Sequence, residues 1–296
     1  MNYIDRFRVR PGSKIDLNKI DANFKDKHES HEHALSEIEA DNQRLHDLQY
    51  LMYAEGKRSL LICLQGRDAA GKDGTINHVL AAMNPQGCKV TGFKVPTKEE
   101  AAHDFLWRCH QHTPGKGQVA IFNRSHYEDV LVQRVHNMVP KEVWSGRYEH
   151  INNFEKLLHD NATHILKFYL HIDPAEELKR FKMRIEDPAR NWKISEGDYA
   201  ERLYWDAYTN AFEDALSKCS TEHAPWFIIP SNHKWFRNLA VSRIISEYME
   251  SLKMRFPKPT VDINEIKKKY HAIASAEEKE QQKTKKGKKS KKRKSK

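Results

Sequence analysis

Short apolar runs alternate with longer stretches of helical periodicity along most of the chain. Four runs have the length and composition of buried strands, at residues 59–64, 119–122, 164–170 and 226–229, and a weaker candidate lies at 88–93. Strands that alternate with helices predict an α/β fold, in which helices cover both faces of a parallel sheet.

Helical spacing fills the intervals between these runs. The expected helices lie at about 73–83, 97–112, 127–138, 141–160, 174–186, 198–218 and 235–254. Pro140 and Pro174 suit the first turn of two of them. Residues 16–55 also read as helical, and their apolar stripe predicts either a helix docked on the core or a contact in an oligomer.

These patterns divide the chain into four parts. We expect a helical extension over 1–55, an α/β core over 56–260, a helical or irregular segment over 261–282 and a disordered tail over 283–296. The tail holds ten lysines and arginines and no acid, so the other residues carry 41 basic and 41 acidic side chains. The net charge of +10 therefore belongs to the tail and says little about the folded body.

Composition excludes several classes of protein. No run approaches the 18 apolar residues of a transmembrane helix, and residues 1–6 lack the apolar stretch of a signal peptide. The four cysteines stand far apart and form no CxxC pair, which argues against a zinc ribbon or a disulfide framework. The 17 histidines show no metal-binding spacing. We therefore expect a cytoplasmic protein that does not enter a membrane.

A glycine-rich loop follows the first predicted strand. Residues 66–72 match the pattern GxxxxGK, and a helical stretch begins near Asp73. Such a loop presents backbone N–H groups and a helix N-terminus to phosphate oxygens, and Lys72 adds a positive charge. The alternative is a plain tight turn between a strand and a helix. The phosphate-binding candidates in and after the loop are Gly66, Arg67, Ala69, Ala70, Gly71, Lys72, Asp73, Gly74 and Thr75.

Two carboxylates are unusual in a loop of this kind. Asp73 stands where a Ser or Thr normally follows the lysine and ligates Mg²⁺, and Asp68 lies inside the loop. A carboxylate in a phosphate-binding loop is unfavourable unless a metal or a basic group offsets its charge. Asp68 is therefore a candidate Mg²⁺ ligand or general base, with a structural role in the turn as the alternative.

A second polar segment follows the strand at 119–122. Asn123 stands where P-loop enzymes commonly place a metal-orienting Asp, and Arg124 is well placed for a phosphate. Glu128 and Asp129 come one turn later and can supply the missing negative charge. The alternative for these two acids is a favourable position in the first turn of a helix.

A third cluster is strongly basic. Arg180 and Arg184 share one helix face, Pro188 ends the helix, and Arg190 and Lys193 follow in a loop. Basic residues on a mobile segment suit a lid that closes over phosphates, here at about 178–200. The alternative is a solvated basic helix end.

Together, the segments 66–76, 122–130 and 187–195 resemble family-2 polyphosphate kinases, over about residues 10–260. The resemblance implies a thymidylate-kinase-like P-loop fold, a three-layer sandwich with a parallel five-stranded sheet and a helical lid. It also implies reversible, Mg²⁺-dependent transfer of the terminal phosphoryl group of inorganic polyphosphate to nucleotides, with Mn²⁺ as a substitute. Many members have Asp in place of Asn123. The Asn-Arg-Ser-x-Tyr-Glu-Asp form looks like the branch that converts AMP to ADP and then to ATP.

The candidate residues take roles in such a reaction. From their charge and position we expect Asp68, Lys72, Arg124 and Glu128 to be catalytic and Asp68, Glu128 and Asp129 to hold the metal. Polyphosphate carries about one negative charge per phosphate, so basic side chains must line its path. The candidates for this path are Arg67, Lys72, Arg124, Arg134, Arg180, Arg184, Arg190 and Lys193. Positioning and electrostatics then supply most of the catalysis.

Two rival functions remain open from the sequence. One is an ATP-dependent nucleotide kinase of the same fold, and the other is a nucleic-acid-binding P-loop protein that depends on the basic tail. The neutral body argues against the second rival, so we expect only non-specific contacts between the tail and nucleic acid. The expected partners are polyphosphate, AMP, ADP, ATP and further copies of the chain in a homo-oligomer.

Overall fold

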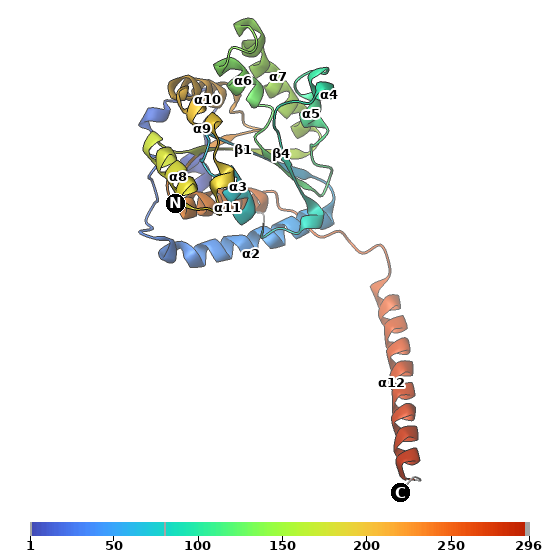
Figure 1. The fold of residues 1–296 in the computed structure, drawn as a ribbon. Coiled ribbons are helices and arrows are strands. Elements are labelled where there is room, and N and C mark those ends of the chain that lie inside the picture. Colours follow the sequence, from blue (N-terminus) through green and yellow to red (C-terminus); the bar gives the residue numbers. More distant parts are fainter. Residues whose placement is uncertain (1, 80, 294–296) are drawn as a thin grey trace. The chain divides into compact units, whose positions relative to one another are not determined.

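The structure, a computed structural model, describes residues 2–79 and 81–293 (Figure 1). The chain divides into two units, Met1–Arg255 and Phe256–Lys296, and the first contains the sheet. Among the described helices, none combines the length and the apolar character needed to cross a lipid bilayer.

Five parallel strands form the central sheet in the order β2-β3-β1-β4-β5. This arrangement confirms the predicted α/β class and all five predicted strands. Residues 60–64 of the central strand are fully buried because helices cover both faces of the sheet. The strands are β1 (Ser59–Gly66), β2 (Cys88–Gly92), β3 (Val119–Asn123), β4 (Thr163–His171) and β5 (Trp226–Pro230).

Helices pack on the two faces of the sheet in separate groups. The helices of the first unit are α1 (Tyr3–Phe7), α2 (His31–Glu55), α3 (Lys72–Val79), α4 (Lys98–Ala101), α5 (Trp107–His110), α6 (Glu128–Val135), α7 (Lys141–Asp160), α8 (Pro174–Glu186), α9 (Glu196–Arg202), α10 (Trp205–Cys219) and α11 (Lys234–Ser251). Figure 1 shows α2, α3 and α11 on one face and α6, α7 and α10 on the other. Alternate residues of β1 enter the apolar cores on the two faces, which makes a three-layer sandwich.

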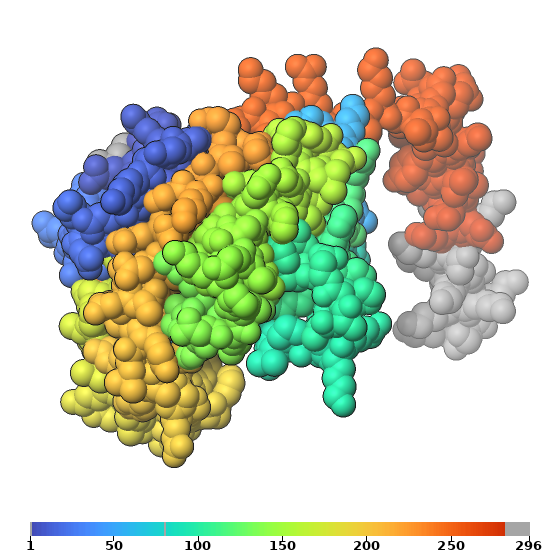
Figure 2. Space-filling model, turned by 90° about the horizontal axis from the view of Figure 1, so that it is seen from above, coloured from blue at the N-terminus to red at the C-terminus, as the bar shows by residue number. Residues whose placement is uncertain are grey.

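The N-terminal segment is less helical than the sequence predicts for residues 16–55. Only α2 is a regular helix there; Leu17–Lys19 form one turn of 3₁₀ helix, and the chain up to Ser30 is otherwise irregular. The backbone N–H of Leu17 donates to Glu213 of α10, so backbone groups serve tertiary contacts instead of a helix. Figure 2 shows this dark blue segment beside the orange segment that contains α10 and β5. Helix α2 itself packs on α11, as the docked-helix alternative requires.

The second unit contains one long helix, α12 (Ile263–Arg293). The segment 261–282 is thus helical from Ile263, and this helix continues to Arg293, into the tail for which the sequence predicts disorder. Asp262 accepts a hydrogen bond from the N–H of Asn264 at the start of the helix. Lys, Ala, Glu and Gln are strong helix formers, so local propensity favours this helix. The remaining tail residues, 294–296, lie outside the described part of the chain.

A buried polar network supports the connection between β3 and α6. Lys167 of β4 is fully buried, and its Nζ donates to Oε2 of Glu155 (2.5 Å), to the hydroxyl of Tyr127 (2.8 Å) and to the carbonyl of Cys219 (2.6 Å). Nε2 of His126 lies 3.1 Å from Oε1 of Glu155. Burial alone would raise the pKa of Glu155, but the ammonium group of Lys167 holds this pKa below its usual value.

We expect Lys167→Met to lower the free energy of unfolding by about 3–5 kcal/mol, because it leaves the Glu155 carboxylate buried without a cation. Urea denaturation measures this loss. The matched control is Lys156→Met, which removes an exposed ion pair with Asp160 and leaves the stability close to that of the wild type. Equal effects of the two substitutions would contradict this account of the network.

Candidate active site

The candidate site lies at the carboxyl ends of β1 and β3. These strands are parallel neighbours in which Leu64 pairs with Asn123, and the N–H of Arg124 donates to the carbonyl of Leu64 at 3.1 Å. The structure therefore brings the glycine-rich loop after β1 beside the polar segment after β3.

The loop after β1 has an unusual backbone that encloses Lys72. Ala69 and Gly71 have φ values of 56° and 105°, and a Cβ on Gly71 would overlap Nη1 of Arg237. Nζ of Lys72 donates to the carbonyls of Gly66 (2.6 Å) and Arg67 (3.1 Å). Burial lowers the pKa of Lys72, and nearby carboxylates, Asp68 first among them, oppose this effect.

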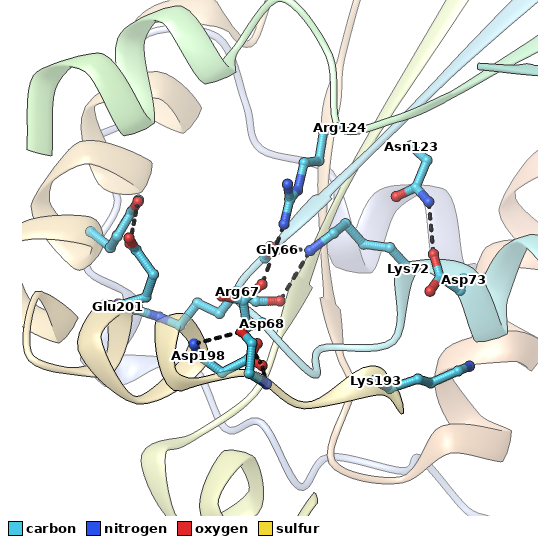
Figure 3. A network of polar contacts seen from close by, with 12 residues as sticks. Gly66, Arg67, Asp68, Lys72, Asp73, Asn123, Arg124, Lys193, Asp198 and Glu201 are labelled. Carbon is cyan, nitrogen blue, oxygen red and sulfur yellow. Dashed lines mark hydrogen bonds and ion pairs between the residues drawn. The ribbon is translucent and has the colours of Figure 1, made fainter. Parts of the chain in front are cut away.

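The two positions that depart from the usual loop pattern contact each other. Nδ2 of Asn123 donates to Oδ1 of Asp73 at 2.7 Å (Figure 3). An Asp at position 123 would place a second carboxylate against Asp73, so the neutral amide suits this neighbour. In the sequence, Asp73 and Asn123 are two separate departures from the usual P-loop pattern. In the structure, they form one interaction.

Asp68 and Arg124 form the second link between the two segments. Nη2 of Arg124 lies 3.4 Å from Oδ1 of Asp68. Arg124 has a φ of 62°, a left-handed conformation that costs a non-glycine residue about 1–3 kcal/mol. Figure 3 shows Arg124 and Lys72 both directed toward the loop at Gly66 and Asp68.

A strongly basic cavity of about 610 Å³ opens on one side of this link. Nine basic side chains and three acidic ones line it, so it suits a polyanion. The cavity reaches from the loop to the expected lid. It is lined by Asp68, Ala69, Gly71, Lys72, Asp73, Gly74, Gly92, Phe93, Lys94, Asn123, Arg124, Arg180, Met183, Arg184, Arg190, Lys193, Asp198, Lys234 and Arg237. We call it the basic cavity.

A smaller cavity of about 230 Å³ lies on the other side and combines aromatic and charged side chains. The guanidinium group of Arg67 stacks 3.6 Å from the centre of the Trp205 ring and donates to Thr209 at 2.6 Å. Burial raises the pKa of Glu128 in its wall. It is lined by Gln65, Gly66, Arg67, Asp68, Arg124, Glu128, Leu131, Val132, Glu177, Glu201, Arg202, Trp205, Tyr208 and Phe212. We call it the aromatic cavity.

Asp68 and Arg124 line both cavities. The expected lid at about 178–200 lines the basic cavity, for example with Lys193, whereas Glu201 of α9, just after this range, lines the aromatic cavity. Nη1 of Arg184 donates to the carbonyl of Lys193 at 3.0 Å, which fixes part of this segment.

Two predicted site residues line neither cavity. Arg134, expected on the polyanion path, forms an ion pair with Asp214 (2.7 Å), stacks over Trp144 and lines neither cavity. Asp129, expected to hold a metal, is buried against Arg147 and Gln133 and also lines neither cavity. Burial raises the pKa of Asp129 to about 6. Helix periodicity turns both side chains of α6 away from the loop.

Three further candidates, Arg180, Ala70 and Thr75, have contacts that build the loop. All five N–H groups of Arg180 have acceptors: Glu176, the carbonyls of Ala69 and Ala70, and the carbonyls of Ser231 and Asn232. Arg180 touches the basic cavity, but its donors position the loop. Ala70 and Thr75 line neither cavity, and the hydroxyl of Thr75 donates to the carbonyl of Gly71.

Several residues of the two cavities were missed from the sequence. Lys94 follows the predicted strand at 88–93, and Lys234 and Arg237 lie at the start of a predicted helix that follows a strand. The rule that ligands bind at the carboxyl ends of parallel strands would have found them. Trp205 of the aromatic cavity is half-buried.

The parallel sheet, its order and the glycine-rich loop beside a basic cavity define a P-loop phosphotransferase. Residues 26–257 match the Polyphosphate kinase 2 (PPK2) family, and the chain belongs to this family. It is 47% identical to the AMP/ADP-polyphosphate phosphotransferase of Meiothermus ruber, over 86% of this chain and 96% of that protein. It is 45% identical to the ADP-polyphosphate phosphotransferase of Rhodopseudomonas palustris, over 86% and 92% of the two chains.

The fold agrees with a solved structure of the same family. The crystal structure of Polyphosphate Kinase 2 from Arthrobacter aurescens TC1 has a TM-score of 0.89 and 38% sequence identity, and the match covers 92% of this chain and 97% of that one.

Proposed function

We propose that the basic cavity holds inorganic polyphosphate, that the aromatic cavity holds the acceptor nucleotide, and that phosphoryl transfer takes place where they meet. The protein is a PPK2 phosphotransferase that moves phosphoryl groups between polyphosphate and AMP or ADP. The observation that carries the proposed geometry is that two cavities of different chemistry share Asp68 and Arg124.

The charge of the basic cavity supports polyphosphate as its occupant. Nine basic side chains exceed what the three acidic ones can neutralise, and a chain of phosphates supplies the missing negative charge. ATP carries only three phosphates and a base, and this cavity offers Phe93 alone as an aromatic surface. The donor is therefore polyphosphate rather than ATP.

The aromatic cavity suits a nucleotide. Trp205, Tyr208 and Phe212 offer apolar faces for a base, and Leu131 and Val132 extend this surface. Arg67 and Arg124 supply positive charge for the acceptor phosphates at the end near the loop. The acceptor oxygen then faces the terminal phosphate of the donor across Asp68 and Arg124.

The residues act by positioning and by charge. Backbone N–H groups of the loop, the N-terminus of α3 and Lys72 hold the donor phosphate and stabilise the charge of the transferring group. Arg124 contacts both cavities and neutralises charge on the donor and the acceptor as the phosphoryl group passes in line between them. Arg184, Arg190 and Lys193 bind the more distant phosphates and exclude water.

The donor set fits a divalent metal that substrate phosphates help to hold. The carboxylates of Asp68 and Glu128 both face the aromatic cavity near the transfer point, whereas the described residues contain no cluster of three potential metal ligands. Mg²⁺ is commonly bound by one or two carboxylates together with substrate phosphates, which matches this arrangement. We assign Mg²⁺ to Asp68 and Glu128, with Mn²⁺ as a substitute that takes similar ligands. The bound metal would neutralise the phosphoryl oxygens during transfer.

We expect Lys72→Ala to lower kcat by at least about 10²-fold, because one preorganised charge at the reacting phosphate is worth a few kcal/mol. A coupled assay with polyphosphate, ADP and Mg²⁺ measures the rate. Lys156→Ala, an exposed change on α7, is the control and retains the wild-type rate. Normal turnover by a folded Lys72→Ala variant would overturn the assignment of the loop.

We expect the enzyme to make ATP from AMP in two successive transfers. AMP and ADP place their terminal phosphates at the same transfer point if the base sits at two depths in the aromatic cavity. A time course with AMP, polyphosphate and Mg²⁺, without adenylate kinase, then shows ADP first and ATP later. Accumulation of ADP alone under excess polyphosphate would restrict the acceptor to AMP.

A further inference from the structure

An arginine to which the proposed reaction gives no individual role lies directly beneath the glycine-rich loop. Arg237 stands in the first turn of α11 and is only 3% exposed. Its Nη1 donates to the carbonyl of Ala70 at 3.3 Å, and its Nε and Nη2 donate to Oδ1 of Asn238. A Cβ on Gly71 would overlap this guanidinium group, and one on Gly74 would lie 3.2 Å from Nη2. Two loop glycines thus leave room for the cation.

The charge of Arg237 has no counter-charge in the described part of the chain. No carboxylate there forms an ion pair with it within 4.0 Å, although burial makes an isolated charge costly. Burial and the neighbouring Arg180 lower the pKa of Arg237 to about 9, so the group is still charged at neutral pH. The first turn of α11 contains no acidic residue, and the positive end of the helix dipole adds to the excess.

Two other arginines near Arg237 do have carboxylate partners. Arg180 is also buried, but it pairs with Glu176 at 2.8 Å. Arg243, two turns further along α11, pairs with Asp41 (2.9 Å) and Glu37 (2.8 Å). Arg237 differs from both, because its hydrogen-bond acceptors, the carbonyl of Ala70 and Oδ1 of Asn238, are neutral.

We propose that Arg237 is a positioning residue whose uncompensated charge, held under Gly71 and Gly74, is neutralised by the phosphates that bind in the loop. It couples occupation of the loop to the stability of the core. The protein with an empty loop carries a buried, unpaired cation, and the protein with a bound polyanion does not. This inference rests on the proposed binding of polyphosphate in the basic cavity.

Thermal unfolding of the full chain, with and without inorganic tripolyphosphate at constant ionic strength, tests the coupling. Arg237→Met should unfold at the same temperature as the wild type or higher without the anion, since an unpaired buried charge is gone. Its Kd for tripolyphosphate should rise at least about tenfold, as for a typical coupling between sites. Arg237→Lys keeps the charge and should retain most of the affinity.

The matched control is Arg243→Met on the same helix. It removes an arginine that is paired with carboxylates, so the unfolding temperature should fall while the Kd for tripolyphosphate stays at the wild-type value. Arg237→Met should thus weaken tripolyphosphate binding without lowering the unfolding temperature, and Arg243→Met should lower the unfolding temperature without weakening binding.

Two results would overturn the inference. One is an Arg237→Met protein that folds, is less stable and yet binds tripolyphosphate like the wild type, which would make Arg237 a structural support. The other is a wild type that tripolyphosphate does not stabilise. In the second case, an assay with long-chain polyphosphate and ADP tells whether the proposed function fails as well. Turnover would leave the proposed function intact and reject only the inference about Arg237, whereas no turnover would reject both.

Discussion

The parallel pairing of β1 with β3 is the constraint on which the site depends. It brings the ends of two strands that are about 60 residues apart in the sequence to one edge of the sheet, with Leu64 opposite Asn123. The loop that holds Lys72 and the segment that holds Arg124 then meet at Asp68. A shift of this register by one residue would turn Asn123 and Arg124 toward the wrong faces and separate them from the loop. The buried ion pair of Lys167 and Glu155 contacts and supports the segment that follows β3.

Charge governs what this geometry can do. The basic cavity is strongly positive, and the aromatic cavity combines acidic, basic and aromatic side chains. Arg124 and Asp68 stand at the boundary, so a phosphoryl group that passes between the cavities stays within reach of one fixed cation. The like charges around the loop repel one another until phosphates bind. Arg237 is the buried member of this group of charges. Substrate binding relieves this electrostatic repulsion, and the relief contributes to the free energy of binding.

The strands and most of the helices of the core could be predicted because their signals are local. Both α7 and α8 have the predicted bounds, since apolar periodicity and a proline mark them. Residues 16–30 were predicted wrongly because tertiary hydrogen bonds, such as that from Leu17 to Glu213, override helical periodicity. Asp129 and Arg134 share a helix with Glu128, and sequence spacing alone did not decide which side chains of that helix face the loop. Arg237 comes from a distant helix, and no motif in the sequence connects it with the loop.

The most direct test of two cavities with separate occupants is a comparison of KM values for the two substrates. Lys193→Ala changes only the basic cavity, and Trp205→Leu changes only the aromatic one. We expect Lys193→Ala to raise the KM for polyphosphate severalfold and to leave the KM for AMP unchanged. Trp205→Leu should raise the KM for AMP about tenfold, as the loss of one base-stacking contact would, and should leave the KM for polyphosphate unchanged. If both substitutions raised the same KM, or if the two effects were exchanged, the assignment of donor and acceptor to separate cavities would be wrong.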